Sequence, residues 1–335
     1  MISAFQQLFG LSLLSCVATF SIAQASDSPE WTTVWKDEFS GSAINRDNWS
    51  PEVSCWGGGN NERQCYTDRS QNIQVKDGFL HLIATPERWT GPTFPDTMLS
   101  HVAQSEQTQE YTSGKVRTVG LHAWRYGRVS ARMKLPSGQG TWPAFWMMPA
   151  DDVYGLWPLS GEIDIMEATN LGTPTADCEA GVESRTSGAL HFGDAIPDNT
   201  YWFSKAECLE TGTPADGWRV YSLEWAEGVF QWFVDGQVFM RLTADQWFTS
   251  SQVAEGRANA PFDQPFYLMF NYAVGGNLAE QQNGGGFDPA SFPSELLIDW
   301  VKVEQCEGDQ ETGRACLTEV DWDGEPSGPW ETMAR

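Results

Sequence analysis

Short runs of alternating apolar and polar residues, separated by turn residues, restrict the folds open to this chain more than any other feature. Residues 128–135 read RVSARMKL, and period-two alternation places their four apolar side chains on one face of a half-buried strand. Glycine and proline, at 32 and 18 residues, interrupt the chain throughout, and no segment has a convincing long helical period. These features predict an all-β chain.

Two Asp-Gly dipeptides predict tight hairpins. The dipeptide at 235–236 lies between residues 231–234 and 237–240, and a second, at 77–78, has the same arrangement. Asp-Gly favours two-residue hairpin turns because both turn positions need a positive φ. Hairpins of this kind in a chain without long helices predict an antiparallel β-sandwich.

The first 25 residues are typical of a secretory signal peptide. An apolar run leads to the triplet Ala23-Gln24-Ala25, which predicts cleavage before Ser26. Lipid attachment at Cys16 is an alternative, although the residues before it fit a lipoprotein signal poorly. We therefore predict a secreted protein, extracellular or periplasmic.

Residues 26–306 are predicted to form one domain. The last apolar strand is expected at residues 296–303, whereas residues 307–335 are acidic and poor in apolar side chains, which predicts a C-terminal surface extension. No repeat or Pro/Ser/Thr-rich linker indicates a separate binding module. No later segment approaches the roughly 18 apolar residues of a transmembrane helix, so we expect no stable membrane span.

Charge restricts the partners. Asp and Glu number 45 against 20 for Lys and Arg, which gives a net charge of -25. Polyanions would meet a repulsive field, so nucleic acid is excluded as a partner and densely sulfated polysaccharide is disfavoured. A neutral polysaccharide is compatible with this charge. We expect the protein to be a monomer.

Six cysteines remain after the signal peptide, and an oxidising compartment would pair them. Sequence alone does not select among the connectivities that six cysteines allow. The simplest hypothesis pairs them in sequence order: Cys55 with Cys65, Cys178 with Cys208, and Cys306 with Cys316. A structural zinc site is disfavoured because no C-x-x-C spacing occurs.

Three acids lie close together in the segment EIDIME at 162–167. In a regular strand Glu162 and Asp164 share a face, whereas Glu167 lies an odd number of positions from both and would point to the other face. One extra residue near Ile165-Met166, accommodated as a β-bulge, would bring Glu167 onto the face of the other two acids. The sequence therefore makes a structural prediction: a bulge inside this strand.

The cluster suits a retaining glycosidase, in which two carboxyl groups lie about 5–5.5 Å apart, one to attack the anomeric carbon and one to protonate the leaving oxygen. Asp164 between them can bias their proton affinities. A solvated strand face and an oxygen-rich calcium site are the other interpretations. Trp142, Trp146 and Trp157 lie just upstream, in a chain with 17 tryptophans, and aromatic faces suit the CH surfaces of sugars.

Matching segments then connect the chain to a known family. They are DEF at 37–39, GNNE at 59–62, YGR at 126–128, GTWPAFWM at 140–147, WP at 157–158, GEIDIME at 161–167, ALHF at 189–192, FDQPFY at 262–267 and AVGGN at 273–277. In this order the chain resembles glycoside hydrolase family 16, in particular its laminarinase-like endo-β-1,3-glucanase branch. The similarity covers nearly all of residues 31–305.

The resemblance implies a β-sandwich jelly roll of two curved antiparallel sheets, with the substrate cleft across the concave face. It implies Glu162 as nucleophile, Glu167 as general acid/base and Asp164 as the residue that tunes them. The implied chemistry is retaining, acts on a neutral polysaccharide such as β-1,3-glucan, and needs no cofactor.

The resemblance also implies substrate-binding residues. His191 is expected beside the catalytic pair, with a satisfied core histidine as the alternative. The remaining subsite candidates are Asn60, Arg125, Trp142, Trp146 and Trp157. A surface ion pair explains Arg125 equally well.

A structural calcium ion is implied on the convex face, with Glu38, Gly78 and Asp299 in the ligand positions. Calcium takes six to eight oxygen ligands, so backbone and water would complete its shell.

Several alternatives remain open. Within the enzyme class, a mixed-linkage β-1,3-1,4-glucanase is the nearest rival, and an agarase or carrageenase is more distant. From another class, a glucan-recognition protein keeps such a fold without catalysis. Residues 176–217 are longer than the usual connection and could wall one end of the cleft, which leaves endo or exo action open.

Overall fold

The computed structural model describes Met1, residues 29–324 and Pro326. The predicted signal peptide and its Cys16 alternative lie outside the described residues. Among the helices of the described chain, none is long and apolar enough to cross a membrane.

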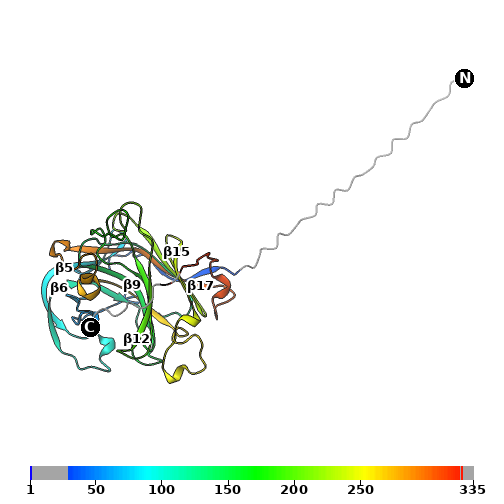
Figure 1. Ribbon diagram of the computed structural model, residues 1–335, viewed down its shortest axis with the longest axis horizontal. Helices are drawn as coiled ribbons and strands as arrows, with labels where there is room; N and C mark the ends of the chain where they lie inside the picture. Colours follow the sequence, from blue (N-terminus) through cyan, green and yellow to red (C-terminus); the bar gives the residue numbers. More distant parts are fainter. Residues whose placement is uncertain (2–28, 325, 327–335) are drawn as a thin grey trace.

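Two β-sheets account for nearly all the regular structure of the described residues (Figure 1). The outer sheet has the order β15-β14-β13-β8-β17-β5-β6-β3, with β1 paired to β17 and β4 paired to β5. The inner sheet has the order β12-β11-β10-β9-β16-β7-β2. Strand pairs are antiparallel, except that β3 pairs with β6 in parallel. The predicted all-β jelly-roll sandwich is confirmed.

The outer strands are β1 Trp31–Asp37, β3 Gln64–Tyr66, β4 Ile73–Lys76, β5 Phe79–Pro92, β6 Glu106–Ser113, β8 Gly127–Lys134, β13 Arg219–Ala226, β14 Val229–Val234, β15 Gln237–Thr243 and β17 Ser294–Cys306. The inner strands are β2 Ser50–Pro51, β7 Lys115–Arg117, β9 Thr141–Pro149, β10 Glu162–Glu167, β11 Ser187–Gly193, β12 Asn199–Lys205 and β16 Phe266–Val274. The helical elements are short: α1 Gly276–Gln281, and 3₁₀ turns at Gly57–Gly59, Asp96–Met98, Ala244–Gln246, Gln252–Ala254, Pro289–Ser291 and Arg314–Cys316.

The core lies between the two sheets. Phe145 and Phe270 come from the inner sheet, Leu223 and Ile298 come from the outer sheet, and all four are fully buried. Because side chains alternate along a strand, the positions between these core residues face away from the core. On the inner sheet those positions carry polar and aromatic side chains, and they form the face on which the candidate site lies.

Both Asp-Gly hairpins are confirmed. Asp235 and Gly236 have φ values of 49° and 79°, and Asp77 and Gly78 have 54° and 83°. These are the left-handed values that a two-residue turn requires.

All three predicted disulfides are present: Cys55–Cys65, Cys178–Cys208 and Cys306–Cys316. The last one fastens the C-terminal extension to the end of β17. Beyond it, Thr318 donates its backbone N–H and its hydroxyl to the Glu224 carboxylate on β13, at 2.8 and 2.6 Å. The start of the extension is therefore packed against the outer sheet.

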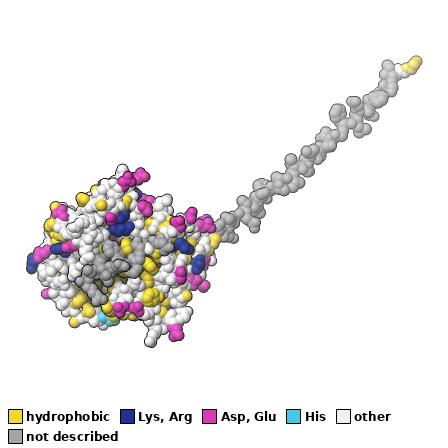
Figure 2. Space-filling view, in the orientation of Figure 1, with side chains coloured by type: hydrophobic (Ala, Val, Ile, Leu, Met, Phe, Trp, Pro, Cys, Tyr) yellow, Lys and Arg dark blue, Asp and Glu magenta, His cyan; other side chains and the backbone are white. Residues whose placement is uncertain are grey.

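The acidic side chains are scattered over the face shown in Figure 2 and do not gather in a single patch. On this face, therefore, the negative charge is dispersed.

Candidate active site

The predicted bulge is present in β10. On one side of the strand Asp164 pairs with Trp146 and Met166 with Phe145, and on the other side the register also shifts between Asp164 and Glu167. Ile165 and Met166 both point into the core, with 2% and 0% of their surface exposed. Two consecutive core-facing residues reset the alternation, so Glu167 faces the same side as Asp164.

The bulge is supported from the outer sheet. Trp232 on β14 reaches through the core and donates its indole N–H to the Asp164 carbonyl at 2.9 Å. Gly188 on β11 leaves room for this ring, because a Cβ at that position would lie 2.5 Å from the Trp232 ring. A buried carbonyl without a partner would be costly, so this hydrogen bond stabilises the irregular backbone.

Glu162 is oriented by one neutral donor. The indole Nε1 of Trp157 donates to Glu162 Oε2 at 2.5 Å. Glu162, Asp164 and His191 bring one polar atom each within 4.8 Å of one another, and His191 Nε2 lies 3.3 Å from Asp164 Oδ2. Because the tryptophan N–H engages Oε2, the other oxygen, Oε1, remains available to attack a carbon atom.

Glu167 is oriented in the same way. Trp142 donates its indole N–H to Glu167 Oε1 at 2.9 Å. An indole N–H is a donor only, so the oxygen it meets must offer a lone pair. Oε2 is therefore the oxygen of Glu167 that this indole does not engage and that can carry a proton toward a substrate.

Burial raises the pKa of Glu167, and the neighbouring negative charges add to this effect although the Trp142 hydrogen bond opposes it. Burial and then Glu162 raise the pKa of Asp164 well above its usual range. For His191, burial alone would lower the pKa, but Glu162 and the contact with Asp164 raise it to about 9. The imidazole of His191 is thus favoured in its protonated form near neutral pH, and burial favours the protonated forms of Glu167 and Asp164.

The pattern matches a nucleophile and a general acid/base. Raising the pKa of a carboxylic acid by burial is how it keeps a proton for transfer near neutrality. Two carboxyl groups on the same face of a sheet, one of them with a pKa raised by burial, can attack an anomeric carbon and protonate the departing oxygen.

Trp146 lies on the same face of the inner sheet. It donates its indole N–H to Asn271 Oδ1 on β16 at 2.6 Å, and the Lys115 ammonium lies 4.8 Å from its ring. Asn271 in turn donates its side-chain Nδ2 to the Tyr66 hydroxyl at 3.0 Å. Trp146 is therefore held in a polar floor next to β10.

Asn60 lies in an exposed loop at the end of the sheet where β16 enters α1. Its backbone carbonyl accepts a hydrogen bond from Asn277 N at 2.7 Å. The adjoining Glu62 is buried, and its charge is one of the causes that raise the pKa of Glu167.

Arg125 is not brought together with the other candidates. Its side chain is exposed and lies over the ring of Tyr126, and its carbonyl accepts from Gln305 on the outer sheet. These neighbours belong to the outer layer, so the structure gives Arg125 no described contact with the catalytic strand.

The calcium candidates lie near one another through the pairing of β17 with β1 and β5. Each carboxylate already has a cationic partner: Lys36 lies 2.9 Å from Glu38, and Arg132 pairs with Asp299. A calcium ion would have to replace these partners, and the site remains a prediction.

The sequence analysis missed two groups of residues near this face of the inner sheet. Asn271 and Tyr66 form the floor that holds Trp146, and they come from segments far from it in sequence. Tyr201 and Phe203 on β12 were also missed, although the alternation in residues 201–205 (YWFSK) is a signal that could have found them. Pairing with β11 places Tyr201 opposite His191.

Comparison with known proteins agrees with this geometry. The family model "Glycosyl hydrolases family 16" matches residues 61–302. The catalogued relative "Glucan endo-1,3-beta-glucosidase A1" of Niallia circulans is 38% identical over 279 residues, which are 81% of this chain and 37% of that protein. The chain therefore spans only part of that relative.

Solved structures show the same similarity. The laminarinase from Rhodothermus marinus is 33% identical and matches with a TM-score of 0.65 over 83% of this chain and 98% of its own. SCLam, described as a non-specific endo-beta-1,3(4)-glucanase, is 34% identical, with a TM-score of 0.62 over 82% of this chain and 91% of its own. With the acids of β10 on one face of an inner sheet, these matches show that the chain belongs to family 16 of the glycosyl hydrolases.

Proposed function

We propose that this protein is a secreted endo-β-1,3-glucanase that retains the anomeric configuration of its substrate. The observation that carries the proposal is the bulge at Ile165–Met166, because it puts Glu162 and Glu167 on one face. The names of the Niallia circulans and Rhodothermus marinus relatives support β-1,3-glucan as the substrate.

In the first step Glu162 Oε1 attacks the anomeric carbon, and the bond from that carbon to the bridging oxygen breaks. Glu167 gives its Oε2 proton to the departing oxygen, so the leaving sugar is released neutral. The Trp157 N–H keeps Glu162 Oε2 engaged and so fixes which oxygen attacks. The positive charge of His191 near Asp164 and Glu162 limits repulsion among the three acids.

In the second step water replaces the leaving sugar. Glu167, now ionised, takes a proton from this water. The water oxygen attacks the anomeric carbon, and the bond from that carbon to Glu162 breaks. Two inversions restore the starting configuration. Each group ends in its initial protonation state, and the residues described here carry out both steps without a cofactor.

Export and a structural calcium ion complete the proposal. Three disulfides support an oxidising compartment, since such bonds persist mainly outside the cytosol. Calcium at Glu38, Gly78 and Asp299 would act on stability alone. If chelation leaves the melting temperature unchanged and no metal copurifies, the calcium proposal is wrong.

A second candidate function is cleavage of β-glucan with mixed linkages, which the similarity to SCLam, a non-specific endo-beta-1,3(4)-glucanase, favours. The test is a reducing-sugar assay on laminarin, lichenan, agarose and carrageenan, with chromatography of the products. We expect a range of oligosaccharides from laminarin and little release from agarose or carrageenan. Faster cleavage of lichenan would select the second candidate. Tight glucan binding without turnover would indicate a recognition protein instead.

A further inference from the structure

Three side chains of the candidate active site have the composition of a metal site. Glu162, Asp164 and His191 each bring one oxygen or nitrogen atom to within 4.8 Å of the other two. Strand pairing explains why they meet, because the register of β10 with β11 places Glu162 opposite His191. Asp164 shares the face of Glu162, two positions along the strand.

One oxygen of this cluster has no hydrogen-bond donor. Asp164 Oδ2 is buried, and within the described part of the chain no donor meets it with hydrogen-bond geometry. His191 Nε2 lies 3.3 Å from it, but not in the direction of a hydrogen bond. A buried carboxylate oxygen without a hydrogen bond is uncommon and costly. Its position therefore indicates a ligand that the protein itself does not supply.

The spacing fits a tetrahedral ion. Zinc binds carboxylate oxygen and imidazole nitrogen at about 2.0–2.2 Å, so two such ligands lie about 3.3–3.6 Å apart in a tetrahedral site. Asp164 Oδ2 and His191 Nε2 already have this separation. The flexible Glu162 side chain would supply the third ligand, and the fourth position would be left to water, as in open zinc sites.

The surroundings orient two of these ligands. Trp157 donates its indole N–H to Glu162 Oε2, which leaves Oε1 directed to the cluster. The backbone carbonyl of Asp164 accepts from the Trp232 indole at 2.9 Å, and this bond fixes the strand where the buried acid lies. Hydrogen bonds of this kind around a metal site hold its ligands in position and increase its affinity.

The charges favour a divalent cation. Glu162, Asp164 and Glu167 surround the His191 ring with negative charge. A divalent cation has twice the charge of a proton and would take the imidazole lone pair in its place, with release of that proton to water. The acids that attract a proton to this ring would therefore attract a metal ion more strongly.

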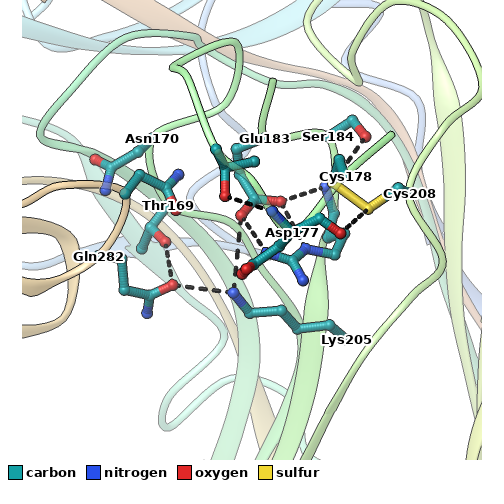
Figure 3. A network of polar contacts seen from close by, with 12 residues as sticks. Thr169, Asn170, Asp177, Cys178, Glu183, Ser184, Lys205, Cys208 and Gln282 are labelled. Atoms are coloured by element: carbon teal, nitrogen blue, oxygen red, sulfur yellow. Dashed lines mark hydrogen bonds and ion pairs between the residues drawn. A yellow bond between two sulfur atoms is a disulfide. The ribbon is translucent and has the colours of Figure 1, made fainter. Parts of the chain in front are cut away.

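The acids just before β11 are the opposite case. Arg185 Nη2 lies 2.8 Å from Asp177 and from Glu183, and Lys205 Nζ lies 3.8 Å from Glu183 (Figure 3). Arginine and lysine keep their protons, so a metal ion would have to displace whole side chains there. Asp164 has His191 as its cationic partner instead, and a histidine can give up its proton to become a metal ligand.

We propose that Glu162, Asp164 and His191 form a binding site for a divalent transition metal such as zinc, and that the bound ion inhibits the enzyme. The ion would engage the Glu162 oxygen that attacks the anomeric carbon, so metal and substrate exclude each other. Inhibition rests on the proposed glucanase function, whereas metal binding does not. Magnesium and calcium fit poorly, because they prefer six or more oxygen ligands.

Calorimetric titration of tag-free protein with zinc chloride tests the site, with calcium chloride present to fill any calcium site. We expect one zinc ion per chain. His191→Asn should weaken zinc binding by more than about tenfold, since even outer partners of a metal ligand contribute that much. Magnesium should not bind comparably, which separates the site from general attraction to a chain of net charge -25.

His81→Asn is the matched control. His81 is also largely buried beside a carboxylate, with Nδ1 at 2.9 Å from Glu295, but among the described residues no third ligand joins this pair. Its zinc affinity should equal that of the wild type. Equal zinc affinities in the wild type, His191→Asn and His81→Asn would refute the site, as would equal losses in both variants.

Anomalous diffraction from a wild-type crystal soaked in zinc chloride gives the position without any variant. The proposal predicts a zinc peak among Glu162, Asp164 and His191. A zinc peak elsewhere and none at this place would overturn it.

The metal site and the proposed function fail separately. If the wild type cleaves β-1,3-glucan, zinc should raise KM with little change in kcat, and EDTA should restore the original KM. Unchanged kinetics at a zinc concentration that saturates the protein in calorimetry would contradict inhibition. If the wild type cleaves no glucan, the proposed function is wrong, and the calorimetric comparison with His191→Asn still decides the metal site.

Discussion

Acidic side chains lie on both sheets, but their neighbours differ. On the outer sheet Glu304 accepts from Arg128 Nε at 2.8 Å and from Lys302 Nζ at 3.0 Å. On the inner sheet Glu162 and Glu167 each accept from a tryptophan N–H. A cation neutralises a carboxylate, whereas a neutral indole orients it and leaves its charge or proton available.

The pKa values follow this difference. Burial opposes ionisation of Glu304, but Arg128 and Lys302 outweigh it and hold its pKa below the usual range. Burial prevails at Glu167 and Asp164, whose pKa values are raised. The same residue type is therefore suited to stability on one sheet and, in the proposed mechanism, to proton transfer on the other, according to the donor that the fold supplies.

The largest expected effect separates the two sheets directly. Glu162→Gln should lower kcat by more than about 10⁴-fold, as expected when a nucleophile is removed, while glucan binding remains. Glu304→Gln should keep kcat but lower the free energy of unfolding by about 1 kcal/mol, because two half-buried donors lose a charged partner. Kinetics and urea titration of both variants measure this. Near-normal turnover in Glu162→Gln would reject its role.

The acid/base should give the next largest effect. Glu167→Gln should lower kcat/KM on glucan by roughly 10²–10⁴-fold, the usual contribution of general acid catalysis. A substrate with a dinitrophenyl leaving group needs no proton to depart, so its first step should be slowed far less. The burst of dinitrophenolate release measures that step. An equal loss on both substrates would show that Glu167 is not the acid.

A smaller effect is expected from the tryptophan donor. The Trp142 hydrogen bond lowers the pKa of Glu167, so Trp142→Phe should raise that pKa further. A general acid works while protonated, and the alkaline limb of kcat/KM should therefore move to higher pH. Trp146→Phe is the control, because Trp146 donates to Asn271 instead. If the alkaline limb of kcat/KM lies at the same pH in Trp142→Phe and Trp146→Phe, Glu167 is not the general acid that Trp142 tunes.

Stability should respond to pH in opposite directions on the two sheets. Glu304 has a lowered pKa, so its contribution is present above its usual pKa and is lost as the pH falls through the lower value. His191 has a pKa raised from 6.5 to about 9, so its contribution is complete below pH 6.5 and is lost as the pH rises through about 9.

Urea unfolding of the wild type across this pH range should thus show two declines. Glu304→Gln should reduce the acid decline, to which other carboxylates with lowered pKa values also contribute, and His191→Asn should reduce the alkaline one. The electrostatic contrast between the sheets would be wrong if Glu304→Gln changed only the alkaline decline and His191→Asn only the acid decline. It would also be wrong if neither variant changed either decline.

Much of this contrast could be read from local sequence. Alternation of apolar and polar residues predicted the strand at 128–135, and the Asp-Gly dipeptides predicted the hairpins. The odd spacing between Glu162 and Glu167 predicted the bulge at Ile165–Met166. All three signals come from neighbouring residues. The three disulfides were also correct, since each closes a loop between cysteines that are consecutive along the chain.

The partners of the acids could not be predicted in this way. Trp232 supports the bulge from a different sheet and lies 68 positions from Asp164. The floor under Trp146 joins β16 to Tyr66, which is 205 positions away from Asn271. Arg125 was chosen by resemblance, and the structure places it with the outer layer. Such contacts arise from tertiary packing, and no local pattern encodes them.

The central claim is that the bulge makes Glu162 the nucleophile and leaves Glu167 beside it as the acid. A 2-deoxy-2-fluoro-glucosyl fluoride with a β-1,3-linked glucose tests it most directly, because fluorine slows release of the glycosyl-enzyme. Peptide mapping by mass spectrometry should find the sugar attached to Glu162. Attachment to Glu167 or to another residue, or turnover of natural substrate with inversion and no adduct, would contradict the account.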